Sequence, residues 1–194
     1  MEGNHLIKNK FFMLITIGFL LVVTRCSTGE TEPVDQAEDI EGLEVIEGQA
    51  IDYETETVVF DDLTLNIPTD TFELDFGDVG FPMIGYTLDL ETGLNFNMVI
   101  EELPTELKLD LDDYLDLLQQ NSDATIEYDN VEKVNVNGRV WAELTGITEG
   151  YPLIQRVYVA NKRAYVLSYG GSIEEFDKLI DVFDAINYSV EFVN

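Results

Sequence analysis

Carboxylates are the side chains with which this chain could do chemistry, because the other usual catalytic groups are nearly absent. His5 is the sole histidine and Cys26 the sole cysteine, whereas Asp and Glu number 39 against 10 Lys and Arg. One histidine and one cysteine exclude Ser-His-Asp and Cys-His sites in the chain beyond Cys26, and zinc sites of the usual His/Cys kind. No glycine-rich phosphate loop of a recognised spacing occurs either.

Four aspartates, Asp110, Asp112, Asp113 and Asp116, form the candidate site for a hard cation. Calcium takes about six to eight oxygen ligands, several of them carboxylates from one loop. The segment lacks the glycine and the distal glutamate of an EF-hand, and helix capping and the helix dipole also favour acids at a helix start. We prefer the helix-cap interpretation, so no cofactor is predicted and Ca²⁺ is kept as an alternative.

Adjacent carboxylates are the other catalytic candidates, at Glu101-Glu102 and Asp112-Asp113. Paired carboxylates can hydrolyse glycosides. Neighbours on a strand point to opposite faces, so Glu101 and Glu102 do not share a site. Because so acidic a chain contains such pairs by chance, we predict that the protein is not an enzyme.

The second half of the chain carries a small group of basic residues, Arg139, Arg156, Lys162 and Arg163. They form a candidate anion-binding or partner-binding site. The alternative, which we favour, is that they neutralise neighbouring carboxylates.

The N-terminal residues predict export. Lys8 and Lys10 precede an apolar run from Phe11 to Val23 that no charge interrupts. This run of about 13 residues is shorter than the roughly 20 residues that span a bilayer core. A basic start followed by a short apolar run is typical of a signal peptide, here 1–25, with an uncleaved anchor as the alternative.

The residues that follow, Val23-Thr24-Arg25-Cys26, resemble the lipobox of bacterial lipoproteins, in which a cysteine after small residues is lipidated. Val23 and Thr24 fit that pattern, whereas Arg25 stands where the family has a small residue. The resemblance implies a lipid on Cys26, which would hold the protein at the outer face of the cytoplasmic membrane. A free cysteine beside an ordinary cleavage site is the alternative.

The formal net charge of −29 excludes nucleic acid as a partner, because no basic stripe is available to displace counterions from phosphates. Attraction to anionic lipid headgroups is excluded for the same reason. Residues 26–56 are rich in acids and poor in apolar residues, which predicts a disordered tether. Within it, Leu43-Glu44-Val45-Ile46 is apolar enough to dock onto a partner or onto the folded domain, which is expected at 57–194.

Alternating apolar residues in this domain predict linked antiparallel strands. The expected strands are 63–67, 84–90, 94–100, 131–136, 139–147, 153–160 and 163–169, with a short last strand near 188–192. Asn137-Gly138 and Asn161-Lys162 mark two hairpin turns. Asp110 can cap a helix that buries Leu111, Tyr114, Leu115 and Leu118, and Ser172 with Glu175 predicts a capping box for the last helix.

The order of these elements resembles the PsbP-like superfamily. The resemblance rests on an opening strand Leu63–Pro68, then NFNMVIEELP, LDDYLDLL and RAYVLSYGGSIEEFDKLIDVFDAI. It implies an α+β fold in which an antiparallel sheet lies between helices, an α/β/α sandwich. The superfamily includes photosystem II accessory subunits, nuclear-transport cofactors and small bacterial lipoproteins, and none of its partner-binding residues has a matching motif here.

Together these observations predict an extracytoplasmic, lipid-anchored adapter that presents a sheet face or loops to an envelope protein. A small-ligand or Ca²⁺-binding module is the alternative. A melting temperature that rises with the cation would distinguish the second from the first.

Overall fold

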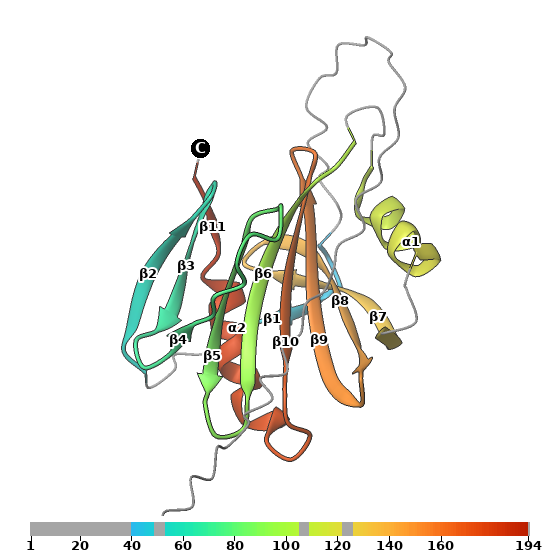
Figure 1. Cartoon of the computed structure of the whole chain (residues 1–194). Helices are drawn as coiled ribbons and strands as arrows, with labels where there is room; N and C mark the ends of the chain where they lie inside the picture. Colours follow the sequence, from blue (N-terminus) through green and yellow to red (C-terminus); the bar gives the residue numbers. More distant parts are fainter. Residues whose placement is uncertain (1–39, 49–52, 105–108, 122–125, 194) are drawn as a thin grey trace, which may run out of the picture.

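The computed structural model describes residues 40–48, 53–104, 109–121 and 126–193, which form two sheets and two helices (Figure 1). The large sheet contains, in spatial order, β1 (Glu44–Ile46), β7 (Ile126–Val136), β8 (Arg139–Thr148), β9 (Tyr151–Ala160), β10 (Arg163–Gly170), β6 (Leu94–Glu102), β5 (Met83–Asp89) and β4 (Phe72–Glu73). The small sheet contains β11 (Glu191–Phe192), β3 (Leu63–Pro68) and β2 (Thr55–Phe60). All neighbours are antiparallel except β1 and β7, which are parallel.

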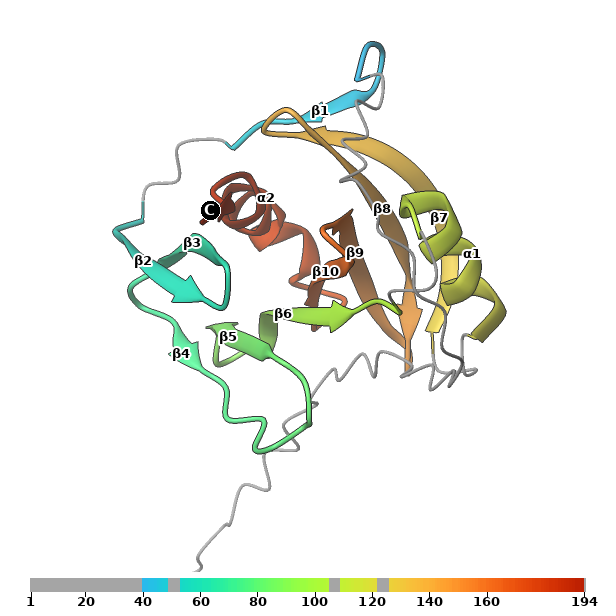
Figure 2. The same cartoon turned by 90° about the horizontal axis from the view of Figure 1, so that it is seen from above.

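The large sheet is strongly curved, and its two faces have different covers. Figure 2 shows α2 (Ile180–Tyr188) on the concave side, the small sheet beside it, and α1 (Leu111–Asn121) on the convex side. The fold is therefore α+β with one helix on each face of a mostly antiparallel sheet. The concave layer differs from a plain helix layer because the small sheet shares it.

Each face of the large sheet has its own core. The concave core joins buried residues of the two sheets and α2, among them Leu65, Trp141, Tyr165 and Phe183. The convex core is smaller and packs Leu111, Tyr114 and Leu115 of α1 against Ala142, Val157, Ala164 and Val166. The three α1 residues lie at helical spacing, so the predicted face of this helix is confirmed.

The predicted hairpins are present. Asn137 and Gly138 join β7 to β8 with φ of 51° and 76°, and Asn161 and Lys162 join β9 to β10 with φ of 52° and 63°. Two consecutive positive φ values suit the two-residue turn whose twist matches antiparallel strands.

The last helix begins later than the capping box predicts. A 3₁₀ turn, η1 (Phe176–Leu179), precedes α2, and Glu175 makes no side-chain capping bond there. The hydroxyl of Tyr169 donates a 2.6 Å hydrogen bond to the carbonyl oxygen of Phe176, and the two rings pack 4.8 Å apart. The chain therefore enters α2 through a 3₁₀ turn, and the predicted capping box of Ser172 and Glu175 is wrong.

The prediction of a disordered tether over 26–56 is wrong where the chain meets the domain. Glu44–Ile46 forms β1 on the edge of β7, and β2 begins at Thr55. Leu43 packs against the convex core and Ile46 against the concave core. The apolar patch therefore docks onto the folded domain itself, one of the two outcomes expected for it. Residues 26–39 lie outside the described residues.

Candidate functional site

The candidate site is the outer edge of β7, where the strand bulges. β1 pairs only with Val134, Asn135 and Val136, and within the described residues no strand pairs with the outer side of Ile126–Glu132. The register with β8 shifts between Tyr128 and Asn130. A bulge bends a strand and re-aims its side chains, and such bulges occur often at binding sites.

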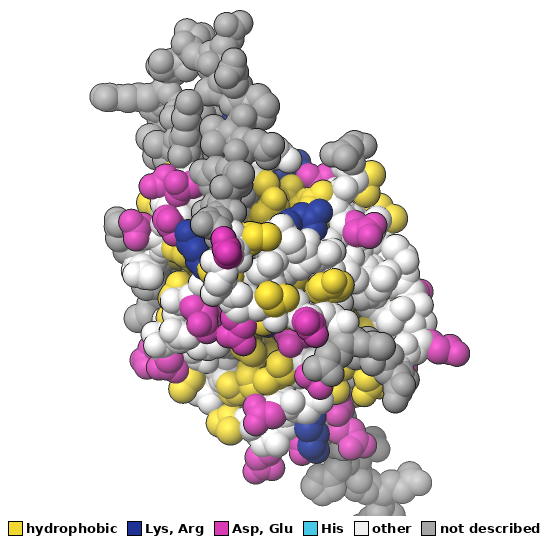
Figure 3. All heavy atoms as spheres, turned by 180° about the vertical axis from the view of Figure 1, so that it is seen from behind, with side chains coloured by type: hydrophobic (Ala, Val, Ile, Leu, Met, Phe, Trp, Pro, Cys, Tyr) yellow, Lys and Arg dark blue, Asp and Glu magenta, His cyan; other side chains and the backbone are white. Residues whose placement is uncertain are grey.

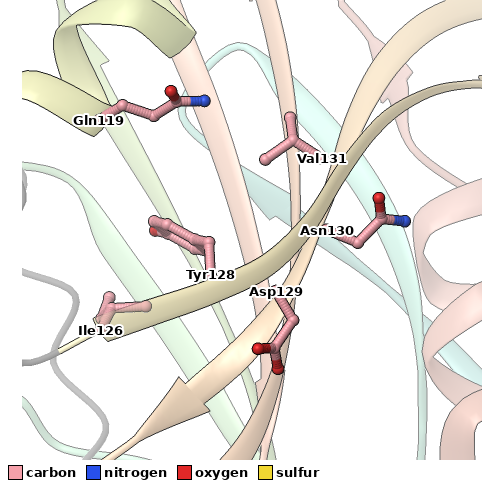
Figure 4. Close-up of a pocket in the computed structure, with 6 residues that line it drawn as sticks. All are labelled: Gln119, Ile126, Tyr128, Asp129, Asn130 and Val131. Carbon is pink, nitrogen blue, oxygen red and sulfur yellow. The ribbon is translucent and has the colours of Figure 1, made fainter.

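A pocket of about 310 Å³ lies at this bulge (Figure 4). Gln119 reaches it from α1, and β7 supplies Ile126, Tyr128, Asp129, Asn130 and Val131. Ile126 and Val131 are aliphatic walls, the Tyr128 ring is aromatic, and Asp129 and Asn130 are exposed polar groups. Figure 4 shows Ile126, Tyr128 and Val131 on one side of the strand, and Asp129 and Asn130 pointing to the other side.

Polar side chains extend from this pocket across the convex face of the sheet. The Tyr128 hydroxyl donates a 2.5 Å hydrogen bond to Oε1 of Gln155, whose Nε2 donates at 2.9 Å to Oγ of Ser168. Gln155 and Ser168 are each 1% exposed. Because buried polar groups are costly without partners, this chain of bonds holds the Tyr128 ring in one position.

A half-buried carboxyl lies under α1 on the same face. The Tyr114 hydroxyl donates a 2.9 Å hydrogen bond to Oε2 of Glu101. Burial raises the pKa of Glu101, while the bond from Tyr114 acts in the opposite direction. Burial and the nearby charge of Glu101 also raise the pKa of Tyr114 well above its usual value, and that of Tyr128 to about 12.

The carboxyl and the two tyrosines of this face are engaged with one another or with neighbouring polar groups. Glu101 is engaged by Tyr114, and both tyrosines are held in their neutral form at physiological pH. Glu102 is exposed and forms a 2.7 Å ion pair with Arg163 instead. Adjacent on β6, the two glutamates have different partners, in keeping with the expectation that they do not share a site.

Three of the four predicted cation-site aspartates have partners within the described part of the protein, and Oδ2 of Asp113 accepts a 3.4 Å hydrogen bond from the backbone N–H of Asp110. Asp110 Oδ1 accepts a 2.9 Å hydrogen bond from the backbone N–H of Asp113, which is a helix cap. Asp112 pairs with Lys133 at 3.0 Å and so connects α1 to β7. Among the described residues no group of three or more His, Cys, Asp or Glu side chains is arranged to hold a metal ion.

The four basic residues do not form one cluster. Arg156 is 2% exposed on the concave face, where its guanidinium contacts Glu143 and Asp184 at 2.7 Å each. Arg163 contacts Asp61 at 2.8 Å, and Arg139 lies over the Phe192 ring at 5.0 Å. Lys162 is exposed in the β9–β10 turn. Arg156 and Arg163 thus neutralise carboxylates, the role favoured from the sequence.

No known family profile matches the chain, and no curated protein matches it. Among solved structures, the solution structure of the cyanobacterial PsbP protein CyanoP from Synechocystis aligns with 75% of this chain and 96% of its own, at 17% identity and a TM-score of 0.53. The fold is PsbP-like.

A second similar structure is a crystal structure from Bacteroides thetaiotaomicron, with a TM-score of 0.52 and 14% identity. The alignment covers 74% of this chain and 50% of that one. At these identities the likeness concerns the fold, so the site of this PsbP-like domain must be read from its own residues. In the described part of the chain, no helix is sufficiently long and apolar to span a bilayer.

Sequence reasoning missed the residues that make this site. Gln155 and Ser168 fell within expected strands without a distinguishing feature, and Tyr128 lay outside the strand expected over 131–136, which begins at Ile126 in the structure. Cys26 and the rest of the leader lie outside the described residues. A signal was present in Gly146, since a side chain there would collide with the backbone of Glu127 and Tyr128. A glycine within a strand indicates a bulge or a close backbone approach.

Proposed function

We propose that this protein is a non-enzymatic binding module of the bacterial cell envelope. It is exported, anchored by a lipid on Cys26 to the outer face of the cytoplasmic membrane, and it binds another envelope protein. The order of Lys8 and Lys10, the short apolar run and Cys26 supports this location. The PsbP-like fold is compatible with the role.

The observation that carries the binding role is the outer edge of β7. A strand edge presents a row of backbone N–H and C=O groups that another chain can use. Here the edge lies beside a pocket and beside polar side chains fixed by the bonds from Tyr128 to Gln155 and Ser168. An edge of this kind is suited to taking up a segment of another protein.

In-cell crosslinking of the tagged full-length chain tests this proposal. We expect one envelope protein to co-purify reproducibly from the membrane fraction and to be lost from a chain lacking 57–194. Cys26→Ser should release most of the protein from membranes, because the lipid is the proposed anchor.

Two results would contradict the proposal separately. A Cys26→Ser variant that stays quantitatively in the membrane fraction would exclude the lipid anchor. Recovery of the protein alone, with no crosslinked partner, would exclude the adapter role.

A further inference from the structure

We propose that the outer edge of β7 over Ile126–Glu132 accepts an extended, basic segment of a partner protein as an added strand. A Lys or Arg side chain of that segment occupies the pocket at the bulge. This inference rests on the proposed binding role and specifies the chemistry of the partner. Strand addition of this kind draws affinity from backbone hydrogen bonds and specificity from pockets for alternate side chains.

The backbone N–H and C=O groups of β7 point alternately toward β8 and away from it, residue by residue. Val136 and Arg139 face each other across the two-residue turn, so they exchange hydrogen bonds between β7 and β8. Alternation then turns the N–H and C=O groups of Asn135 and Val131 away from β8. At Asn135 those groups face β1, while at Val131 no described strand lies opposite.

β1 itself shows that this edge accepts a strand. Val45 pairs with Asn135 although β1 comes from a distant part of the chain and is only three residues long. The pairing stops at Val134, so an incoming segment could continue along the same edge over the bulge. The chain's own N-terminal segment turns just before β1, where the N–H of Leu43 donates a 3.4 Å hydrogen bond to the carbonyl oxygen of Ile40, so its described residues do not continue along β7.

Charge decides between the possible occupants. Glu127, Asp129 and Glu132 are exposed on this part of β7, and the neighbouring cation Lys133 is paired with Asp112. A second copy of this chain would bring carboxylates against these carboxylates. Like charges on facing strands are unfavourable, whereas a basic strand is complementary.

The pocket suits a basic side chain with a long aliphatic stem, either Lys or Arg. Ile126, Val131 and the Tyr128 ring offer apolar contact for an aliphatic stem on one side of β7, whereas the Asp129 carboxylate points to the other side of the strand (Figure 4). A basic side chain that reaches across the open edge at the bulge can bring its ammonium or guanidinium head to this carboxylate. Lys and Arg bury their stems along apolar surface and keep their charged heads near water, as this open pocket requires.

The test uses a fluorescent short peptide in which lysine alternates with valine, titrated into the purified domain with its N-terminal acidic segment. A control peptide has the same sequence with alternate backbone amides methylated, so it keeps the charge but cannot form the ladder. We expect the first peptide to bind and to slow hydrogen exchange of the Val131 amide, and the methylated peptide to bind at least tenfold more weakly.

Two matched pairs of variants locate the interaction. Val131→Pro removes an outward N–H and should abolish binding, while Val131→Ala, which loses similar packing, should retain most of it. Asp129→Asn should weaken binding about tenfold through loss of a charge-assisted bond, while Asp177→Asn, which removes one exposed carboxylate far along the chain in η1, should leave it unchanged.

Equal binding of the two peptides, equal effects of Asp129→Asn and Asp177→Asn, or unchanged exchange at Val131 would each overturn the inference and indicate attraction by net charge alone. Absence of peptide binding would also overturn it. In either case a crosslinked envelope partner would leave the proposed function standing, with its contact on another surface.

Discussion

Glu101 shows how a single position on this acidic chain acquires a distinct property. Most carboxylates lie on the surface, as they do on the face seen in Figure 3, where acidic side chains are spread widely and basic ones are few. Glu101 instead lies between α1 and the sheet, bonded to Tyr114. Burial raises its pKa because the charged form loses more hydration than the neutral form.

Replacing this carboxyl should change the pH dependence of stability. The folded-state pKa of Glu101 is above the unfolded value, so its contribution is fully present below the unfolded pKa and is lost as pH rises through the folded pKa. Glu101→Gln avoids that loss. Its free energy of unfolding relative to wild type should therefore increase between about pH 4.5 and 7, by about 1.4 kcal/mol for each unit by which the pKa is raised.

Urea denaturation of both proteins across this pH range measures the difference. The pKa of Asp184 is also raised by burial, but Asp184 is present in both proteins and cancels. A difference in free energy that does not change with pH would contradict the assignment.

At the scale of elements, Arg156 connects three of them. It lies on β9 and contacts Glu143 of β8, Asp184 and Asn187 of α2, and the Phe183 ring at 4.8 Å. The two carboxylates are only 15% and 20% exposed, so each depends on the guanidinium for compensation. This cation therefore helps to hold α2 in the concave face.

Arg156→Met should destabilise the fold by about 3 kcal/mol, because removing one partner leaves two largely buried carboxylates without a compensating charge. The free energy of unfolding in urea measures the loss. Lys178→Met is the matched control: its side chain is 67% exposed in an ion pair with Glu175, so it should cost less than about 0.5 kcal/mol. Equal effects of the two substitutions would show that the burial of Arg156 does not increase its contribution to the free energy of unfolding.

At the scale of the whole molecule, the high net charge affects the stability of the folded state. A formal charge of −29 on 194 residues opposes a compact state by self-repulsion. Exposed charges interact over about 10 Å at 0.1 M salt and only about 3 Å at 1 M. Stability should accordingly depend on ionic strength rather than on one particular cation.

The melting temperature should rise by several degrees between about 0.1 and 1 M NaCl, because screening weakens the repulsion in the folded state. CaCl₂ compared with NaCl at equal ionic strength separates general screening from a specific site. We expect no additional rise, since Asp110 and Asp112 already have partners in the protein. A large rise at millimolar Ca²⁺ alone would revive the calcium-binding alternative.

Local patterns were enough to predict most of the elements. Period-two alternation marked the strands from Leu63 onward, Asn137-Gly138 marked a hairpin, and Asp110 marked the start of α1. Each of these depends on residues within a few positions of one another, which is the range over which turn, strand and cap preferences act. The predicted capping box at Ser172 is wrong, because a 3₁₀ turn, η1, precedes α2 and Glu175 makes no side-chain capping bond there.

The candidate site was decided by contacts between distant residues. Tyr128 and Gln155 are 27 positions apart, and Arg156 and Asp184 are 28 apart, so neither contact can be recognised from a short-range sequence pattern. The docking of β1 on β7 and the curvature of the sheet depend in the same way on which surfaces meet. The sequence by itself determined the acidity and the order of the elements, because both reside in composition and short-range preference. Only the tertiary structure decided which carboxylate is partly buried and which strand edge lies open, because burial and pairing arise when separate elements pack.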